Sequence, residues 1–567
     1  MVRRGILITG ALVLFGAALC TLLAVRHAFQ VKNDLQSARG TISRVETDLR
    51  QGDVESADAQ LAQAQRSVRH AGTSAHGLSW DVALRVPWTG RHLRAVQRAA
   101  DAANIVGDDV LPPLLSAVSE VREHHPLANS RVDLAVLARI QADVHKAAAG
   151  ANRARSLLAR DNGPLLASVA RPVQQARDSV DHVANALRTA DRALGVAPAM
   201  LGSQGPRLWF VAVQNPAESR ATGGFLGAFA LVRTDRGRIE LLRTGSDIDF
   251  QQSDVPVVSL PGAARTWQDV GSTRAWYDAN LTPHFPDAAQ TIRGLWAHQS
   301  GESADGVIAL DPKILSLLLR ASGPVTLPGG TSISSDSVVD FVCHGEYVQF
   351  ADRAERKRVL GDLAKAVFNQ FMHASNSTAM LRSLIDAGTS GHLFAWSRLA
   401  PEETVLTSGK VGGALPDPKA PFLEVVTQNF GGNKLDYYLR RRVRIVKKSA
   451  GVWDVAVTLT NTAPSGLPPF MSVRSDKPQP AVPYGQARTG LALYAGRGAQ
   501  VESAALNGKP TSLVPDTDHG TSLVWTYLEL PRNAPATVTF TLREPKGVLA
   551  YRQQPLVVDD EVALSAK

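Results

Sequence analysis

Two acidic residues follow a short strand-like run near the middle of the chain. Asp247 and Asp249 lie in the segment 243–250, RTGSDIDF, and on a continuing strand their spacing of two would direct both carboxylates to the same side. Carboxylate oxygens are the ligands that Mg²⁺ prefers, usually together with substrate phosphates. The pair therefore predicts a magnesium site formed by Asp247 and Asp249, and an exposed acidic strand end is the other interpretation of the pattern.

A basic cluster opens a predicted helix further along the chain, at 352–358, DRAERKR. Arg353, Arg356 and Lys357 share one helix face because they lie at positions i, i+3 and i+4. The helix dipole favours acidic side chains in a first turn, so basic side chains there indicate an anionic ligand. A solvated basic face is the alternative interpretation.

A glycine-rich turn with charged side chains lies at 214–227, QNPAESRATGGFLG. Glycines such as Gly223 and Gly224 let a ligand approach the backbone closely, and Arg220 is suited to bind a phosphate. With Glu218, these glycines are the predicted binding residues, unless the segment is only a tight connection with a solvated ion pair. Across the three segments, the predicted catalytic residues are Arg220, Asp247, Arg353 and Arg356.

Other kinds of site are excluded or lack support. The chain has 2 cysteines, Cys20 and Cys343, which rules out a disulfide-stapled scaffold and an all-cysteine metal site. It contains no Walker-type phosphate loop and no GxGxxG, GxSxG or HExxH motif. The net charge of +9 favours an anionic surface or substrate. Because aromatic stacking motifs are missing, we expect no nucleic-acid partner.

The elements that must position these residues begin with an apolar segment. Residues 5–25 contain no charged side chain, and a helix of that length, at about 1.5 Å per residue, spans a hydrocarbon core of roughly 30 Å. Arg3 and Arg4 precede it, which favours a cytoplasmic N-terminus and an extracytoplasmic bulk. The sequence predicts a cytoplasmic stub and transmembrane signal anchor over 1–29, held in the lipid membrane through residues 5–25. A removed signal peptide is the alternative.

Three further parts follow this segment, since 567 residues exceed a single core. Apolar residues at alternating spacings of three and four predict an all-α helical arm over 30–200. Strand-like runs at 208–213, 228–234 and 238–242, mixed with helical patterns such as 354–372, predict a central α/β domain over 201–400. Recurrent strands and turns predict an all-β sandwich-like module over 401–567.

Several segments of this sequence resemble the bacterial family catalogued as domain of unknown function 4012, DUF4012. The segments that carry the resemblance are 87–103, 214–231, 278–290, 305–325 and 428–443, among them QNPAESRATGGFLGAFAL and DGVIALDPKILSLLLRASGPV. The family name implies no activity.

The central part is also distantly similar, in its order of features, to the LytR–CpsA–Psr family of membrane-anchored phosphotransferases. DRAERKR stands where that family has D-x-x-R-x-x-R-Q, but Lys357 replaces the usual Gln and Asp352 adjoins Arg353. The resemblance implies that Arg220, Arg353 and Arg356 clamp a pyrophosphate, and that Asp247, with Asp249, holds Mg²⁺.

On this basis we expect a membrane-anchored cell-envelope protein that binds a polyprenyl-pyrophosphate-linked glycopolymer or transfers it to peptidoglycan of the cell wall. Transfer would be Mg²⁺-assisted phosphoryl transfer. The alternative is a non-enzymatic envelope scaffold or polymer-binding protein, so the sequence leaves open whether the protein is an enzyme. Convergence of the four predicted catalytic side chains in one concave site beside an apolar groove would distinguish the two.

Overall fold

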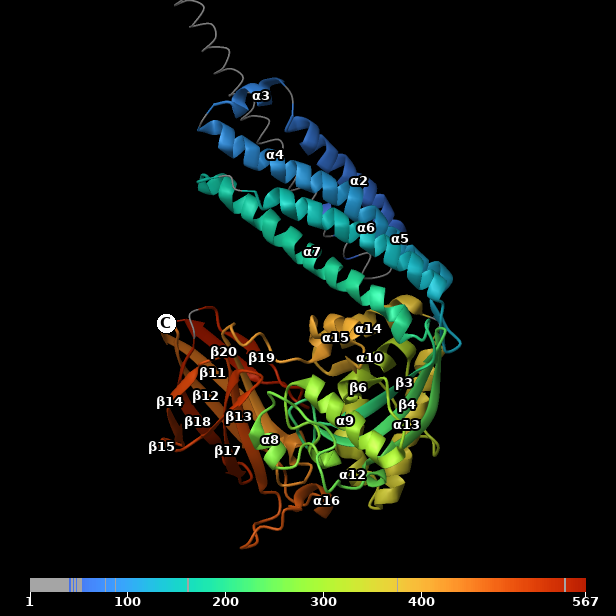
Figure 1. Cartoon of the computed structure of the whole chain (residues 1–567), viewed down its shortest axis with the longest axis vertical. Coiled ribbons are helices and arrows are strands. Elements are labelled where there is room, and N and C mark those ends of the chain that lie inside the picture. Colours follow the sequence, from blue (N-terminus) through green and yellow to red (C-terminus); the bar gives the residue numbers. More distant parts are fainter. Residues whose placement is uncertain are drawn as a thin grey trace, which may run out of the picture. The chain divides into compact units, whose positions relative to one another are not determined.

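The computed structural model describes residues 40–41, 44, 47, 54–76, 78–86, 88–160, 163–374, 376–544 and 547–566. The chain divides into two compact units, coloured by sequence in Figure 1. The described residues of 1–126 and 133–198 form a helical unit, and those of 127–132 and 199–567 form a mixed unit.

The helical unit contains long amphipathic helices with alanine-rich seams. Ala147, Ala148 and Ala151 are buried together, and Gly150 lies beside Asp109, where an added Cβ would come within 2.9 Å of the Asp109 carbonyl oxygen. Small residues therefore let these helices approach closely. The helices are α2 (Val54–Ser74), α3 (Leu78–Leu84), α4 (Thr89–Ile105), η1 (Val106–Val110), α5 (Leu111–His124), α6 (Leu134–Leu158) and α7 (Ala167–Met200).

No helix in the described ranges is long and apolar enough to cross a membrane. The longest ones carry charged side chains along their length, as α7 does with Arg177, Asp181 and Arg188. This finding corrects the expected fold class, which began with a transmembrane helix, and the expected single-pass membrane location. The apolar segment 5–25 itself lies outside the described residues.

The mixed unit is built around a seven-stranded sheet in the order β1-β2-β5-β4-β3-β6-β9. β3 and β6 are parallel, whereas β4 and β5 form an antiparallel hairpin whose turn residues Arg236 and Gly237 have positive φ. The strands are β1 (Leu127–Ala128), β2 (Arg131–Val132), β3 (Arg207–Asn215), β4 (Phe225–Asp235), β5 (Arg238–Ser246), β6 (Gly306–Leu310) and β9 (Leu393–Ser397).

The side chains of β3 point alternately to the two faces of this sheet, and helices pack on these faces. Phe210 and Ala212 pack with α9 on one face, and helices α10 and α13 contact β3 and β4. The helices of this part are α8 (Arg265–Asp269), α9 (Phe285–Ser300), α10 (Pro312–Ser322), α11 (Val338–Asp340), α12 (Glu346–Gln349), α13 (Arg353–Met372), α14 (Ser377–Ser390) and α15 (Ala400–Thr407), and a small hairpin consists of β7 (Val325–Thr326) and β8 (Ser332–Ile333).

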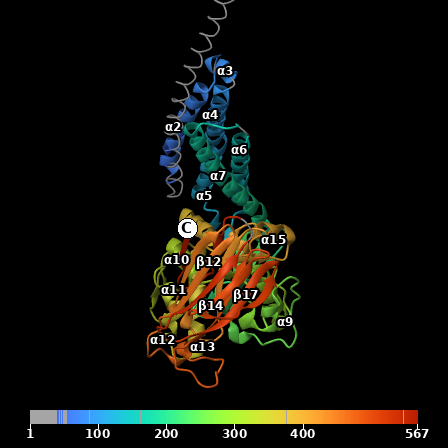
Figure 2. The same cartoon turned by 90° about the vertical axis from the view of Figure 1, so that its left-hand side faces the viewer.

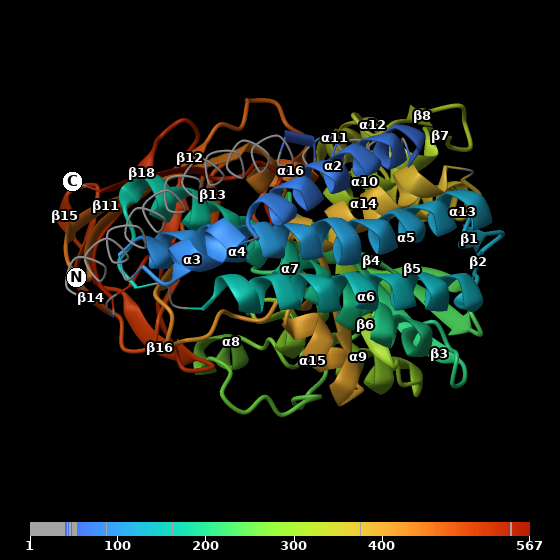
Figure 3. The same cartoon turned by 90° about the horizontal axis from the view of Figure 1, so that it is seen from above.

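Two further sheets form a sandwich at the C-terminal side of the mixed unit, which faces the viewer in Figure 2. Their orders are β16-β17-β13-β10-β19 and β15-β14-β18-β12-β11-β20, and Figure 3 shows them from above. The elements are β10 (Phe422–Asn429), β11 (Leu439–Ser449), β12 (Val452–Asn461), α16 (Pro469–Ser472), β13 (Ala487–Ala495), β14 (Gln500–Leu506), β15 (Lys509–Pro510), β16 (Val514–Asp518), β17 (Thr521–Leu530), β18 (Ala536–Arg543), β19 (Ala550–Arg552) and β20 (Glu561–Ala566).

The sandwich shares a buried contact with loops and helix α8 of the part that is built on the central sheet. Every residue of β10 is buried, because one face of its sheet packs into the sandwich core and the other meets Trp267 and Leu281. The Trp267 indole donates a hydrogen bond of 2.7 Å to the Tyr494 hydroxyl across this contact. The two parts are therefore one unit, with a shared boundary where a site can form.

Candidate functional site

A cavity of about 590 Å³ lies at that boundary, within the usual size range of small-molecule sites. Its wall combines the ends of β3 and β4, helices α12 and α13, and residues that follow β10. Apolar side chains line one part: Leu315, Val342, Leu360, Leu363 and Ala364. Charged side chains line the other: Arg220, Arg353, Arg356, Lys357 and Lys434, with Glu218, Asp247, Asp278 and Glu346.

All four predicted catalytic residues thus reach one concave site beside an apolar wall, together with Glu218. Their catalytic role stays a prediction.

Arg356 is the cation best placed for a ligand. It is 4% exposed, its Nη1 donates to the Phe350 and Ala351 carbonyls at 2.8 and 2.9 Å, and its guanidinium lies over the Phe470 ring at 4.4 Å. Within the described part of the chain, none of its hydrogen bonds uses Nε or Nη2. A buried guanidinium with two nitrogens left for an acceptor is suited to a phosphate.

Asp247 lies between two cations of α13. Its Oδ2 accepts a hydrogen bond of 2.8 Å from Arg353, and its Oδ1 is ion-paired with Lys357. Lys357 also donates to the Gly227 carbonyl at 2.9 Å, and burial lowers the pKa of Lys357 despite the Asp247 charge. Asp247 therefore orients the basic face of α13.

Asp249 does not join Asp247, contrary to the same-side expectation. β5 ends at Ser246, and a 3₁₀ turn, η2 (Asp247–Asp249), follows instead of a continuing strand. Residues two apart on such a turn point in different directions. Asp249 accepts a hydrogen bond of 2.7 Å from the Ser246 backbone. Magnesium binding stays a prediction, and this geometry does not favour it.

Arg220 uses its donors inside the protein. Nε donates to the Tyr277 carbonyl and Nη1 to the Ser219 and Asn429 carbonyls, all at 3.0 Å, while Nη2 donates to Glu218 at 3.2 Å. These bonds connect the turn after β3 to two distant segments. Arg220 is thus a wall residue whose three nitrogens already donate hydrogen bonds inside the protein. A residue that clamps a phosphate would need nitrogens that are still available to donate.

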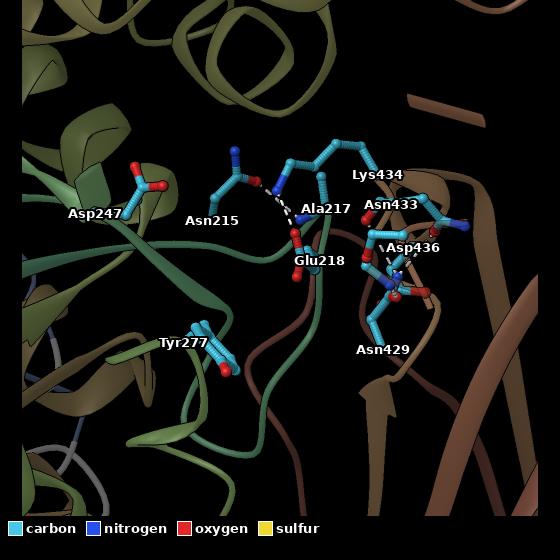
Figure 4. Close-up of polar contacts among 12 residues, drawn as sticks. Asn215, Ala217, Glu218, Asp247, Tyr277, Asn429, Asn433, Lys434 and Asp436 are labelled. Atoms are coloured by element: carbon cyan, nitrogen blue, oxygen red, sulfur yellow. Dashed lines mark hydrogen bonds and ion pairs between the residues drawn. The ribbon is translucent and has the colours of Figure 1, made fainter. Parts of the chain in front are cut away.

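Glu218 is paired with Lys434 inside the wall, as Figure 4 shows. The Nζ–Oε2 distance is 2.5 Å, and the side chains are 6% and 9% exposed. Burial alone would raise the pKa of Glu218, but the charges of Lys434 and Arg220 hold this pKa below its usual value. Glu218 is therefore a carboxylate that fixes Lys434 beside the cavity.

The predicted binding glycines do not line the cavity. Gly224 lies so close to the end of β3 that an added Cβ would stand 2.1 Å from the Asn215 carbonyl oxygen, and Gly223 has a φ of 139°. Both glycines serve the tight return of the chain into β4. The close neighbour of Gly224 is thus this protein's own backbone, and binding of a ligand by these glycines stays a prediction.

The sequence patterns missed Glu346, which opens α12 directly after a π-helical turn, η4 (Phe341–Gly345). Glu346 is 1% exposed, and its buried Oε2 has no hydrogen-bond partner. Burial raises the pKa of Glu346 to about 7, although Tyr347, Lys357 and other cations lower it. The one available signal was an acid within the apolar stretch VVDFVCHGEYV.

Asp278 is a second unusual carboxyl on the wall, in η3 (Trp276–Asp278). Burial raises the pKa of Asp278 to about 6, with Arg220 lowering it and Glu218 raising it. Two carboxyls of the cavity can therefore change protonation near neutral pH.

A separate group, His284, Asp287 and His519, has ligand atoms within 4.8 Å of one another, alone among the described residues. The His519 Nε2 lies 2.7 Å from Asp287, and the His284 Nδ1 accepts a hydrogen bond of 3.1 Å from the Leu415 backbone. Neutral His284 must then carry its proton on Nε2, the nitrogen a metal would need. These three side chains therefore fit an ion pair between His519 and Asp287 better than a metal site.

Comparisons with known proteins agree with part of the expectation. A comparison with curated proteins finds no match. Among solved structures, protein gbs0355 from Streptococcus agalactiae matches with 13% identity over 38% of this chain and 76% of that chain. Its TM-score of 0.24 does not establish a shared fold. The resemblance to the LytR–CpsA–Psr family is not shown by these matches and stays a prediction.

The family model described as "Protein of unknown function (DUF4012)" matches residues 204–347. This match contains Glu218, Arg220, Asp247, Asp278 and Glu346, and it ends before α13 begins. Residues 204–347 therefore match the DUF4012 family, as the resemblance in the sequence predicted.

Proposed function

We propose that the mixed unit binds an amphiphilic anion, a phosphate or pyrophosphate attached to an apolar chain of polyprenyl type, in the cavity of about 590 Å³. The observation that carries this proposal is the buried Arg356, whose Nε and Nη2 are not used by the hydrogen bonds of the described residues, beside an apolar wall.

The charges of the wall support an anionic ligand. Five basic and four acidic side chains line the cavity, so the lining carries one net positive charge when every group is ionised. With Glu346 protonated, which its pKa of about 7 favours below neutral pH, the net charge is two, and with Asp278 also protonated, below about pH 6, it is three. A pyrophosphate fits this charge.

The apolar wall supports the attached chain. Leu315 comes from α10, and Leu360 and Leu363 come from successive turns of α13, directly beyond the basic first turn. The same helix therefore offers cations at its start and hydrocarbon further on. Each buried CH₂ group of a ligand would contribute about 0.8 kcal/mol.

A second candidate function is transfer of the bound group, and Asp278 is the observation that favours it. An acceptor hydroxyl would attack the phosphorus that bears the glycan, and its proton would pass to the Asp278 carboxylate. The bond to the bridging oxygen would break, and polyprenyl phosphate would leave. A carboxyl with a pKa of about 6 is suited to accept that proton.

Calorimetric titration of the full chain with farnesyl pyrophosphate tests the binding proposal. We expect tighter binding of this ligand than of farnesol or inorganic pyrophosphate, because only farnesyl pyrophosphate contacts both the charged part and the apolar part of the cavity wall. Arg356→Ala should weaken binding about tenfold or more, the cost of one charge-assisted contact. Arg358→Ala is the matched control, since Arg358 is on the same helix, 63% exposed and absent from the cavity wall.

Failure of the folded wild type to bind farnesyl pyrophosphate would overturn the proposal. We expect equal affinity in Mg²⁺ and in a chelator, because Asp247 is already paired with two cations. A strict Mg²⁺ requirement would instead support the magnesium site predicted from the sequence. For the transfer step, Asp278→Asn should retain binding but release no farnesyl phosphate from a farnesyl-pyrophosphate-linked sugar and a glycan acceptor.

A further inference from the structure

Glu346 differs from Glu218 and Asp247, two other acidic residues of the cavity wall, in its pairing. Glu218 and Asp247 are each ion-paired with two cations, whereas no ion pair within the described ranges includes Glu346. It is 1% exposed, and its Oε2 is buried without a hydrogen-bond partner. A buried carboxylate in this state costs much more free energy than a buried neutral carboxylic acid does.

The groups that face Glu346 come from several elements. Lys357 and Arg356 of α13 and Lys434 after β10 favour its charged form, and Tyr347 hydrogen-bonds to it from its own helix. Cys343 of η4 interacts with it electrostatically, but burial raises the pKa of that thiol well above its usual value, so it stays neutral. The charged form of Glu346 therefore depends on three cations of the cavity.

Those same cations are the ones that an anionic ligand would engage. A bound phosphate would offset their charge and add a negative charge to the same cavity, and both effects disfavour a second anion there. Burial would then decide the protonation state in favour of the neutral acid.

We infer that Glu346 takes up one proton when the cavity binds its anion, and that this residue determines how the affinity for anions depends on pH. The inference rests on the proposed function, since it concerns the same ligand and the same cavity.

The direction of the effect follows from the two protonation states. Below about pH 7, where Glu346 already carries its proton in the free protein, binding needs no proton uptake and the affinity is highest. Above that pH each ligand bound must bring a proton with it. The affinity then falls by up to about tenfold per pH unit, the limit for one linked proton.

The test is calorimetric titration of the full chain with farnesyl pyrophosphate at about pH 8, in two buffers of different ionisation enthalpy, with a pH series around it. The terminal phosphate is already fully ionised there, with a second pKa of about 6, so a proton taken up belongs to the protein. We expect nearly one proton per ligand for the wild type. Glu346→Gln should take up none and lose the fall in affinity.

Glu544→Gln is the matched control. Burial raises the pKa of Glu544 to about 7 as well, but Glu544 does not line the cavity, so the variant should keep the wild-type profile. Binding without proton uptake would overturn this inference and leave the proposed function standing. Proton uptake retained by a folded Glu346→Gln would also overturn it, because the proton would then bind elsewhere, for example on Lys357. If the variant does not fold, the wild-type titration still tests the inference, because the absence of proton uptake overturns it.

Discussion

The ammonium of Lys434 and the carboxylate of Glu218 form an ion pair inside the protein, although 216 residues separate them in the sequence. The pair joins the turn after β3 to the segment after β10 (Figure 4). Beside it, the Ser219 backbone and hydroxyl donate to Asp436 at 2.8 and 2.6 Å. The cavity wall is therefore a network that the central sheet and the sandwich complete only together.

Removal of one partner of this pair should destabilise the protein. We expect Glu218→Ala to lower the free energy of unfolding by about 3–5 kcal/mol, because Lys434 is left as a buried, unpaired charge. The double variant Glu218→Ala/Lys434→Met should recover much of the loss. Urea denaturation followed by tryptophan fluorescence measures both changes.

The control for this experiment is an exposed ion pair, Arg442 with Glu561. Arg442→Ala should change the free energy of unfolding by less than about 1 kcal/mol, as is usual for exposed pairs. Equal losses of unfolding free energy for Glu218→Ala and Arg442→Ala would show that the buried pair stabilises the protein no more than the exposed pair does.

Arg220→Lys should act on stability more than on ligand binding. A lysine cannot replace the fork that satisfies the carbonyls of Ser219, Tyr277 and Asn429, so we expect a loss of about 2–4 kcal/mol in unfolding free energy. Titration of the folded variant with farnesyl pyrophosphate should show a smaller change than Arg356→Ala. The opposite order would indicate that Arg220 contacts the ligand.

Glu346 should make the stability of the protein fall as pH rises. The folded protein keeps the proton up to about pH 7, while the unfolded chain loses it near the ordinary value of 4.5. Between these values the wild type loses unfolding free energy on the order of 3 kcal/mol relative to Glu346→Gln. Thermal unfolding of both proteins across this pH range measures the difference. Parallel pH profiles of the wild type and Glu346→Gln would contradict the assignment of this pH dependence to Glu346.

His519 should contribute stability with the same sign. Its hydrogen bond and ion pair with Asp287 raise the pKa of His519 above its ordinary value of 6.5. The contribution is complete below pH 6.5 and is lost as the pH rises through the raised pKa. Asp287→Asn should flatten this part of the thermal unfolding profile, and His298→Asn, at an exposed position of α9, should not.

The sequence by itself determined the local elements of the mixed unit. Short runs rich in β-branched and aromatic residues predicted strands at 208–213, 228–234 and 238–242, and these lie within β3, β4 and β5. The helical period predicted 354–372, which is α13 but for one residue. Such patterns depend on neighbours a few positions away, so they can be read from a single chain. The membrane-spanning helix was the exception, since the described residues contain none.

Only the tertiary structure decided what each charged side chain does. Local spacing brought Arg353, Arg356 and Lys357 to one face, but Asp249 turned away because β5 ended one residue before Asp247. The partners of Arg220 and Glu218, and the burial of Glu346, come from segments far apart in the sequence. A protonation state depends on burial and on charges in space, and neither quantity follows from the order of residues along the chain.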